Sequence, residues 1–337
     1  MPGLFNKSNL KKARMRYYYK YQSFGPHTGL NFVMLFKHSA HYFPRKSFLN
    51  DPTDCEPFLE IPNNKSAIRE ALTKIRNSER SLYFGLEAAN LLSQLDSDDS
   101  DEETSKGTGL LYQNPFLQTT ASPLSNGQNL IRRFMGAQIG IPRIFSLSRS
   151  WNIPQMWSHY AGAHSGFCIE YQHDPDTASD PKCLAIRYTR ERSRVSLDLV
   201  LLLDTQTDIA EGILERVYCE KSEGWRSEEE IRFVARKVWK NDDICVLSLP
   251  SGDFYKMSNL MPKRIIFGAQ CDQNKIDEVA KIAAEHLEVD SRPEFVKLVQ
   301  KKDSYEFDEL AIKFDEFGNR KIPKIPPLPP LPPLKSH

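Results

Sequence analysis

Polar and aromatic side chains are concentrated between Ile144 and Tyr171 beyond what a purely structural segment needs. This segment, IFSLSRSWNIPQMWSHYAGAHSGFCIEY, holds five serines, six aromatic residues and two histidines. Ser146 and Ser148 alternate with apolar Phe145 and Leu147, so on a strand both hydroxyls face the same side of a sheet. We therefore expect a site at this strand.

A short helix should follow the serine pair, because Pro154 suits a first helical turn. It would carry Trp157, His159 and Tyr160. A histidine titrates near neutral pH and can act as a general acid or base, and the aromatic rings can stack on a flat ligand. His159 and His164 are five residues apart and do not share a helical face, so we expect no metal site.

Carboxylates enter a later strand at Glu228, Glu229 and Glu230. If the extended segment begins early, Glu228 and Glu230 share one face of it, and Arg232 continues that face. Such a run is also typical of a solvated surface. Paired carboxylates that lead into the apolar strand IRFVAR are, however, candidates for catalysis.

Composition and missing motifs exclude several classes. The 45 basic and 44 acidic residues leave a net charge of +1, which provides no global field for nucleic acid or a membrane. The sequence lacks GxGxxG, GxxxxGK[ST] and GxSxG, and its six cysteines include no CxxC pair. With neither a signal-peptide core nor a long apolar run, the chain is expected to be cytoplasmic, with reduced thiols and no membrane contact.

The expected fold is α+β, with a mixed or antiparallel sheet packed with helices. Strand-like segments recur as YYYKYQSF, RIFSLS, GFCIEY, CLAIRYT, EIRFVAR, ICVLSL and KRIIFG, and FVKLVQK and FDELAIKF should form a last hairpin. Helices are predicted at Ser66 to Asn77, Leu82 to Leu95, Val195 to Glu220 and Asp272 to Leu287. We expect one domain from residues 1–95 and 110–318, an acidic disordered insert at 96–109, and a proline-rich tail at 319–337.

Two terminal segments indicate partners. The tail contains Pro330-x-x-Pro333-x-Lys335, a spacing that SH3-like grooves recognise, although a solvated tail without a ligand fits the same composition. Near the other end, basic residues at positions 11, 12, 14 and 16 precede the aromatic Tyr17 to Tyr19. This pattern is compatible with nucleic acid, or with a solvated terminus.

The chain resembles the bacterial domain-of-unknown-function 2971 (DUF2971) family in several blocks, a resemblance that supplies a grouping and no activity. The matching blocks are Tyr19-Lys20-Tyr21; Phe48-Leu49-Asn50-Asp51-Pro52; Ser146, Ser148, Met156, Trp157, His159, Tyr160, Gly166 and Phe167; Trp225, Glu228, Glu230 and Arg232; and Ile265 to Gly268. By this resemblance, Tyr19, Asn50 and Asp51 join the candidate binding residues.

A more distant resemblance is to the mono-ADP-ribosyltransferases, in the order of a polar first-strand residue, a serine-x-serine strand and a glutamate-x-glutamate. It implies NAD as a co-substrate and an ADP-ribosyltransferase-like fold. Glu230, beside Glu228, would stabilise the positive charge that develops on the ribose. The serines would hold the ribose and the carboxylate, and Tyr160 or Trp157 would stack on the nicotinamide. Lys20 would pair with a pyrophosphate oxygen.

Two other functions stay open at this point. His159, Asp51 and Glu230 could form a nuclease or hydrolase centre, with His159 as the general acid or base. The aromatic cluster could equally line a non-catalytic ligand-binding pocket of an interaction protein.

Overall fold

The structure is a computed structural model. It describes residues 15–78, 82–97, 122–140, 142–175, 182–202, 212, 217–235 and 244–321. The elements of the first half are β1 (Arg16–Gln22), α2 (Thr28–His38), β2 (Ala40–Pro44), η1 (Lys46–Phe48), β3 (Phe58–Leu59), α3 (Lys65–Arg76), α4 (Leu82–Ser97), α5 (Pro123–Ile139), β4 (Arg143–Ser148), α6 (Pro154–His159) and β5 (Phe167–His173). Those of the second half are β6 (Lys182–Ala185), β7 (Arg187–Thr189), β8 (Arg194–Val195), α7 (Leu197–Leu201), β9 (Glu220–Ser222), η4 (Glu223–Glu228), β10 (Glu230–Ala235), β11 (Cys245–Leu249), β12 (Gly252–Lys256), β13 (Leu260–Phe267), α9 (Gln273–His286), η6 (Val289–Ser291), β14 (Glu294–Gln300) and β15 (Phe307–Ile312).

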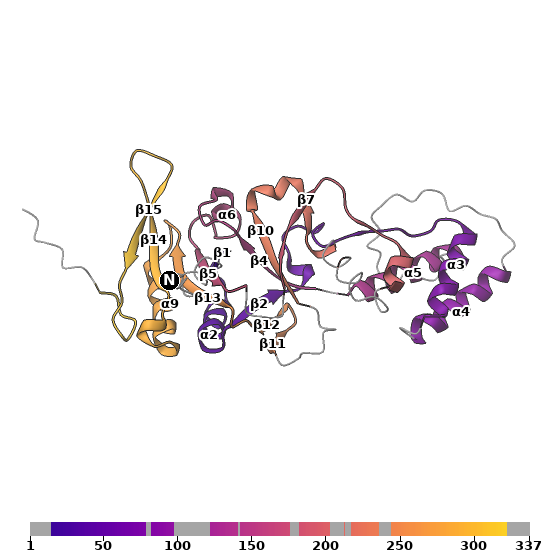
Figure 1. Cartoon of the computed structure of the whole chain (residues 1–337), viewed down its shortest axis with the longest axis horizontal. Coiled ribbons are helices and arrows are strands. Elements are labelled where there is room, and N and C mark those ends of the chain that lie inside the picture. Colours follow the sequence, from indigo (N-terminus) through magenta and orange to yellow (C-terminus); the bar gives the residue numbers. More distant parts are fainter. Residues whose placement is uncertain are drawn as a thin grey trace, which may run out of the picture.

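An eight-stranded sheet in the order β15-β14-β13-β5-β1-β4-β10-β6 organises the molecule (Figure 1). The sheet is mixed, because β13 and β14 run parallel whereas the other neighbours are antiparallel. Helices α2 and α9 supply apolar side chains to the core cluster on one of its faces. The predicted α+β class is therefore confirmed, and β14 and β15 form the expected antiparallel pair.

The large sheet is nearly interrupted at its middle. β1 pairs with β5 along its whole length, from Arg16 to Gln22, but with β4 only through Tyr19 and Ser148. β4 in turn pairs with β10 from Arg143 to Ser148. The strands β6, β10 and β4 thus form one half of the sheet and the remaining strands the other.

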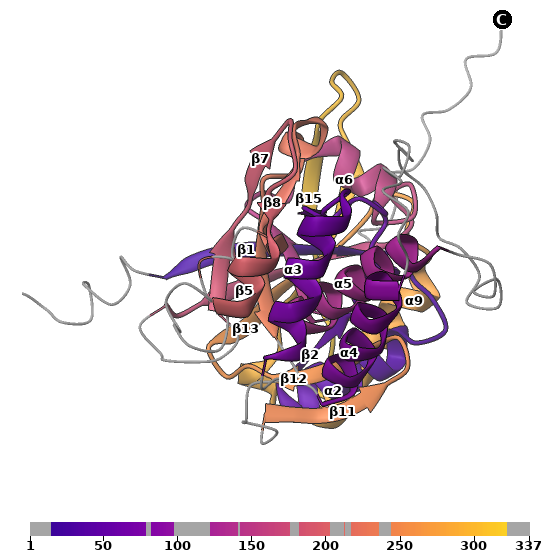
Figure 2. The same cartoon turned by 90° about the vertical axis from the view of Figure 1, so that its right-hand side faces the viewer.

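A second apolar core lies under α3, α4 and α5, at the end of the molecule opposite β14 and β15 (Figures 1 and 2). The predicted helix here begins at Lys65 rather than Ser66. Its N-cap is Asn64, whose side chain accepts a hydrogen bond from the Ala67 amide. Asn is among the best N-cap residues, which explains the earlier start.

Several predicted elements differ from the structure. The long helix predicted from Val195 to Glu220 is present only in part among the described residues. Leu197–Leu201 form α7 and residues 212, 217 and 218 are helical, but Val195 ends β8 and Glu220 begins β9. The segment CLAIRYT forms two strands, β6 and β7, on different sheets. The first residues of the predicted acidic insert, Asp96 and Ser97, belong to α4.

Other predictions concern residues that the structure does not describe. They are residues 98–109 of the acidic insert, the tail with its SH3-like motif from residue 322 onward, and the basic positions 11, 12 and 14. None of the helices in the described segments combines the length and apolar character needed to cross a bilayer.

His41 of β2 is buried among aromatic rings. It is 3% exposed and its ring lies 5.2 Å from both Phe145 and Tyr171, centroid to centroid. No described side chain hydrogen-bonds either ring nitrogen, and the backbone at Leu260 and Met257 favours the charged ring less than burial opposes it. Burial lowers the pKa of His41 to about 3, so the folded protein keeps this ring neutral.

We expect His41→Phe to make the protein less sensitive to acid. The unfolded chain takes up a proton at His41 below about pH 6.5, whereas the folded protein does so only near 3, so stability falls as the pH drops through this window. Urea unfolding between pH 7 and pH 4 should show a shallower loss of stability for the variant. Exposed His38, changed to Phe, is the control. An unchanged slope for His41→Phe would contradict a neutral buried ring.

Candidate functional site

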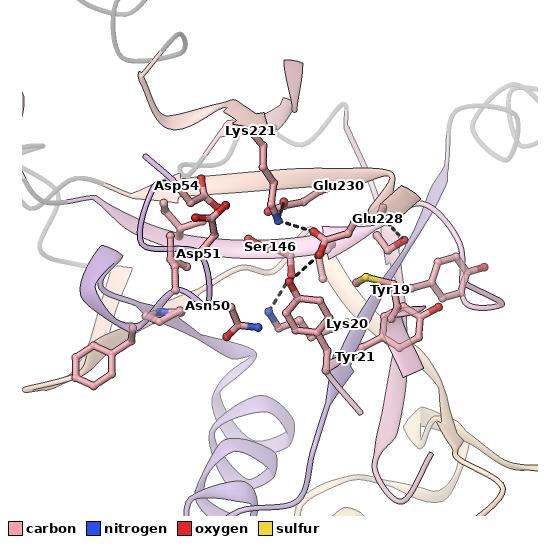
Figure 3. Close-up of a pocket in the computed structure, with 18 residues that line it drawn as sticks. Tyr19, Lys20, Tyr21, Asn50, Asp51, Asp54, Ser146, Lys221, Glu228 and Glu230 are labelled. Carbon is pink, nitrogen blue, oxygen red and sulfur yellow. Dashed lines mark hydrogen bonds and ion pairs between the residues drawn. The ribbon is translucent and has the colours of Figure 1, made fainter. Parts of the chain in front are cut away.

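A cavity of about 170 Å³ lies at the break between β1 and β4 (Figure 3). β1 and β4 line one side, the loop after β2 a second, and β9, η4 and β10 a third. Most of the predicted site residues line it, although they come from distant parts of the sequence: Tyr19, Lys20, Asn50, Asp51, Ser146, Ser148, Tyr160, Glu228 and Glu230.

One lysine ammonium joins the two carboxylates of the site. Lys221 Nζ donates to Glu230 Oε2 over 2.9 Å and also to Glu228 Oε2 (Figure 3). The three side chains are each 5–6% exposed. Burial opposes the charge on Lys221, but the two carboxylates outweigh it and raise its pKa. Lys221 therefore stays charged and holds both glutamates in place.

Arg232 extends this arrangement into the core. Its fully buried guanidinium donates from Nε to Glu230 Oε1 over 2.7 Å and pairs with Asp54 through both terminal nitrogens. A third acceptor is the carbonyl of Tyr218, at 2.7 Å. Burial alone would raise the pKa of Glu230, yet Arg232 and Lys221 together lower it to about 2. Glu230 is thus ionised at neutral pH.

These five buried groups do not cancel in charge. Three carboxylates, on Asp54, Glu228 and Glu230, share two cations, on Lys221 and Arg232. The cluster, called the carboxylate cluster below, retains one net negative charge on a wall of the cavity. In surroundings of low polarity, such a charge acts strongly on a nearby ligand.

The opposite wall carries a cation. Lys20 Nζ donates to the Ser146 carbonyl over 2.9 Å and lies 5.1 Å from the centre of the Phe145 ring. Among the described residues Lys20 forms no ion pair within 4 Å. Burial lowers the pKa of Lys20 to about 8. Lys20 is therefore a positive group at neutral pH whose charge no carboxylate compensates directly.

Glu228 reaches the cluster by a different route from the one predicted. It ends the 3-10 helix η4 rather than lying on the strand, and Glu229 (φ 48°) turns the chain into β10. Tyr160 donates its hydroxyl to Glu228 Oε1 over 2.7 Å, and Ser148 Oγ donates to the Glu228 carbonyl over 2.8 Å. The tight turn brings Glu228 and Glu230 to the same ammonium.

Asn50 and Asp51 belong to the loop that covers one side of the cavity. The indole of Trp225 donates to Asp51 Oδ2 over 2.8 Å, and Thr53 donates to Asp51 Oδ1 from both its amide and its hydroxyl. Trp225 lies in η4, next to the carboxylate cluster. This contact fixes the loop to the wall that carries Glu228.

Two predicted residues lie away from the cavity. Trp157 is 2% exposed, packs edge-on against Tyr21, and donates its indole N–H to the Trp151 carbonyl over 2.7 Å. It is a core residue, so the stacking role proposed for Trp157 or Tyr160 falls to Tyr160 alone. His159 is exposed, and its ring centre lies 6.4 Å from that of Trp225.

Sequence reasoning missed Lys221 and Asp54, the residues that complete the cluster. No motif surrounds Lys221, and Asp54 lies outside the family block that ends at Pro52. A buried lysine becomes recognisable only once its carboxylate partners are located. In the described part of the chain, no three histidine, cysteine or carboxylate side chains are grouped as a metal site requires.

The cluster should respond strongly to the loss of one cation. Arg232→Met would leave Asp54 and Glu230 buried without their partner, and we expect it to cost about 3–5 kcal/mol of unfolding free energy. Arg226→Met is the matched control, because Arg226 pairs with Glu223 at the exposed surface, where solvent screens the two charges and loss of the pair should change stability little. Urea unfolding measures both. Equal effects of the two substitutions would contradict the buried network.

Comparison with known protein families gave one match, in the middle of the chain. The model of the DUF2971 family, whose members are proteins of unknown function, matches residues 156–233, a segment that contains most of α6, all of η4 and most of β10. No curated protein and no solved structure matched the chain. The match over residues 156–233 supports the resemblance to the DUF2971 family that the sequence motifs indicate.

Proposed function

We propose that the cavity binds the nicotinamide and ribose end of NAD, and that the protein cleaves the bond between them in an ADP-ribosyltransferase-like reaction. The observation that carries this proposal is the carboxylate cluster, with its one net negative charge, facing Lys20 across the cavity. The three sequence blocks of the transferase resemblance, on β1, β4 and the η4–β10 turn, line this one cavity.

The charges of NAD complement the two walls. Its nicotinamide ring is positively charged and its pyrophosphate negative. The ring and ribose would lie against the carboxylate cluster, and a phosphate oxygen could accept a hydrogen bond from Lys20. A cavity of about 170 Å³ is smaller than the roughly 300–1,000 Å³ of pockets that enclose whole ligands. It would therefore hold one end of the dinucleotide.

The chemistry needs negative charge near the ribose. When the bond from the ribose carbon to the ring nitrogen breaks, its electron pair stays on nicotinamide, which leaves as a neutral molecule. The ribosyl carbon becomes oxocarbenium-like, and a fixed carboxylate stabilises it. A nucleophile, water or an acceptor, then adds to that carbon and loses a proton.

The two glutamates would contribute differently. Cations hold both oxygens of Glu230, which keeps it ionised and immobile. Among the described residues, Glu228 Oε1, in contrast, accepts only from the neutral hydroxyl of Tyr160. Its charge is therefore the less compensated of the two. We assign to the pair the stabilisation of the ribosyl cation, with Tyr160 placed to contact the nicotinamide.

The hydrolase alternative has less support. It required His159 to act with Asp51 and Glu230, but His159 is exposed and does not line the cavity. No other observation favours it.

Changing either glutamate should abolish most of the turnover. We expect Glu230→Gln and Glu228→Gln to lower nicotinamide release from NAD by at least ~100-fold, because each removes charge that stabilises the transition state. Ser146→Ala, which leaves the buried ion pairs intact, should weaken NAD binding in calorimetry.

Glu170→Gln is the control, since Glu170 of β5 is buried and pairs with Arg264 of β13 but does not line the cavity. Melting temperatures establish that each variant is folded. Full turnover in folded Glu230→Gln, or no NAD binding by wild type at millimolar concentration, would refute the proposal.

NAD binding should also weaken as the pH rises through about 8. Lys20 carries its charge below its pKa of about 8 and loses it above, so its hydrogen bond to a phosphate would disappear in that range. KM for NAD measured from pH 7 to pH 9.5 should rise in wild type. In Lys20→Arg it should stay flat, because a guanidinium keeps its charge. A wild-type KM independent of pH would show that Lys20 does not bind the phosphate.

A further inference from the structure

A second cavity, also of about 170 Å³, lies next to the first. Lys221 is common to the linings of both, and the two cavities share the loop around Asp54, with Asp51 and Asp54 lining the first and Thr53 and Cys55 the second. The far side of the second cavity is formed by the segment between β7 and β8, which contributes Arg190 and Arg192.

These two arginines differ from the other arginines nearby. Arg187 pairs with Glu220, Arg194 with Glu60, and Arg226 with Glu223. Arg190 and Arg192, by contrast, form no ion pair within 4 Å and no hydrogen bond in the described part of the chain, and both are exposed. Glu223, which pairs with Arg226, is near enough to Arg190 for that arginine to help lower its pKa. Two guanidinium groups that no described carboxylate contacts directly therefore line one concave surface.

The acidic residues that line this cavity compensate the positive charges of Arg190 and Arg192 only in part. Glu56 pairs with Lys46, and Glu220 is engaged by Arg187 and by both the amide and the hydroxyl of Ser193. Glu191, between the two arginines, is the one carboxylate of this lining without an ion pair among the described residues. Lys221 is already neutralised by Glu228 and Glu230. The uncompensated charge of the cavity is thus positive.

We propose that this second cavity binds a phosphoryl group through Arg190 and Arg192. Guanidinium groups match phosphate oxygens in geometry and form strong charge-assisted hydrogen bonds with them. Ser222, also in the lining, starts η4 without a capping hydrogen bond from its side chain, so its hydroxyl can donate to the same anion. The phosphoryl group could be free phosphate or the phosphate ester of a larger ligand.

The inference does not depend on the proposed function. Neither Arg190 nor Arg192 lines the first cavity, and among the described residues Lys221 is the only one that lines both. Phosphoryl binding can therefore be measured whether or not NAD is a substrate.

Calorimetric titration of the full-length protein with inorganic phosphate, at constant ionic strength, tests the site. We expect Arg190→Ala/Arg192→Ala to raise Kd for phosphate at least tenfold. The matched control is Arg194→Ala/Arg226→Ala, which removes two exposed, ion-paired arginines outside the cavity and should leave Kd within twofold of wild type. The variants change exposed residues, and their melting temperatures verify folding.

A second arm replaces phosphate by adenosine monophosphate. Tighter binding of the nucleotide than of phosphate, lost in Arg190→Ala/Arg192→Ala, identifies a phosphate ester as the ligand; equal affinity identifies free phosphate. Both results support the site. No binding of either probe to wild type at tens of millimolar, or equal losses in the two double variants, would overturn it.

Discussion

The ammonium of Lys221 is the group on which the site depends. It holds Glu228 and Glu230 together, and Arg232 then connects Glu230 to Asp54 on the loop that covers the cavity. Each of these charges is buried, so removal of any one leaves another without compensation. β9, η4, β10 and the covering loop are therefore held in one arrangement by a single network.

The break in the large sheet creates the cavity that the carboxylate cluster lines. Continuous pairing between β1 and β4 would fill the space with backbone and side chains. Contact at only Tyr19 and Ser148 leaves a cavity, with the negative cluster on one wall and Lys20 on the other. A ligand with separated positive and negative charges complements such walls, and this complementarity is the physical basis for proposing NAD. The sheet thereby determines both the position of the carboxylates and the polarity of the site.

Local sequence patterns predicted individual residues of the site, but they did not predict the ion pairs that join these residues. Alternation placed Ser146 and Ser148 on a strand, and the family motif drew attention to Lys20 and Asp51, all of which line the cavity. Lys221 and Asp54 were not identified from the sequence, because their roles arise from tertiary contacts that no local pattern encodes. Trp157 was misread for a related reason: a tryptophan suits a binding site or a core, and only its bond to the Trp151 carbonyl settles which.

A crystal structure of the Glu230→Gln variant grown with NAD would test the central claim most directly. The account predicts intact NAD with its nicotinamide ribose in the cavity between β1 and β4, the ribose carbon facing positions 228 and 230, and a phosphate oxygen near Lys20. An empty cavity at saturating NAD, or NAD bound at another surface, would contradict it.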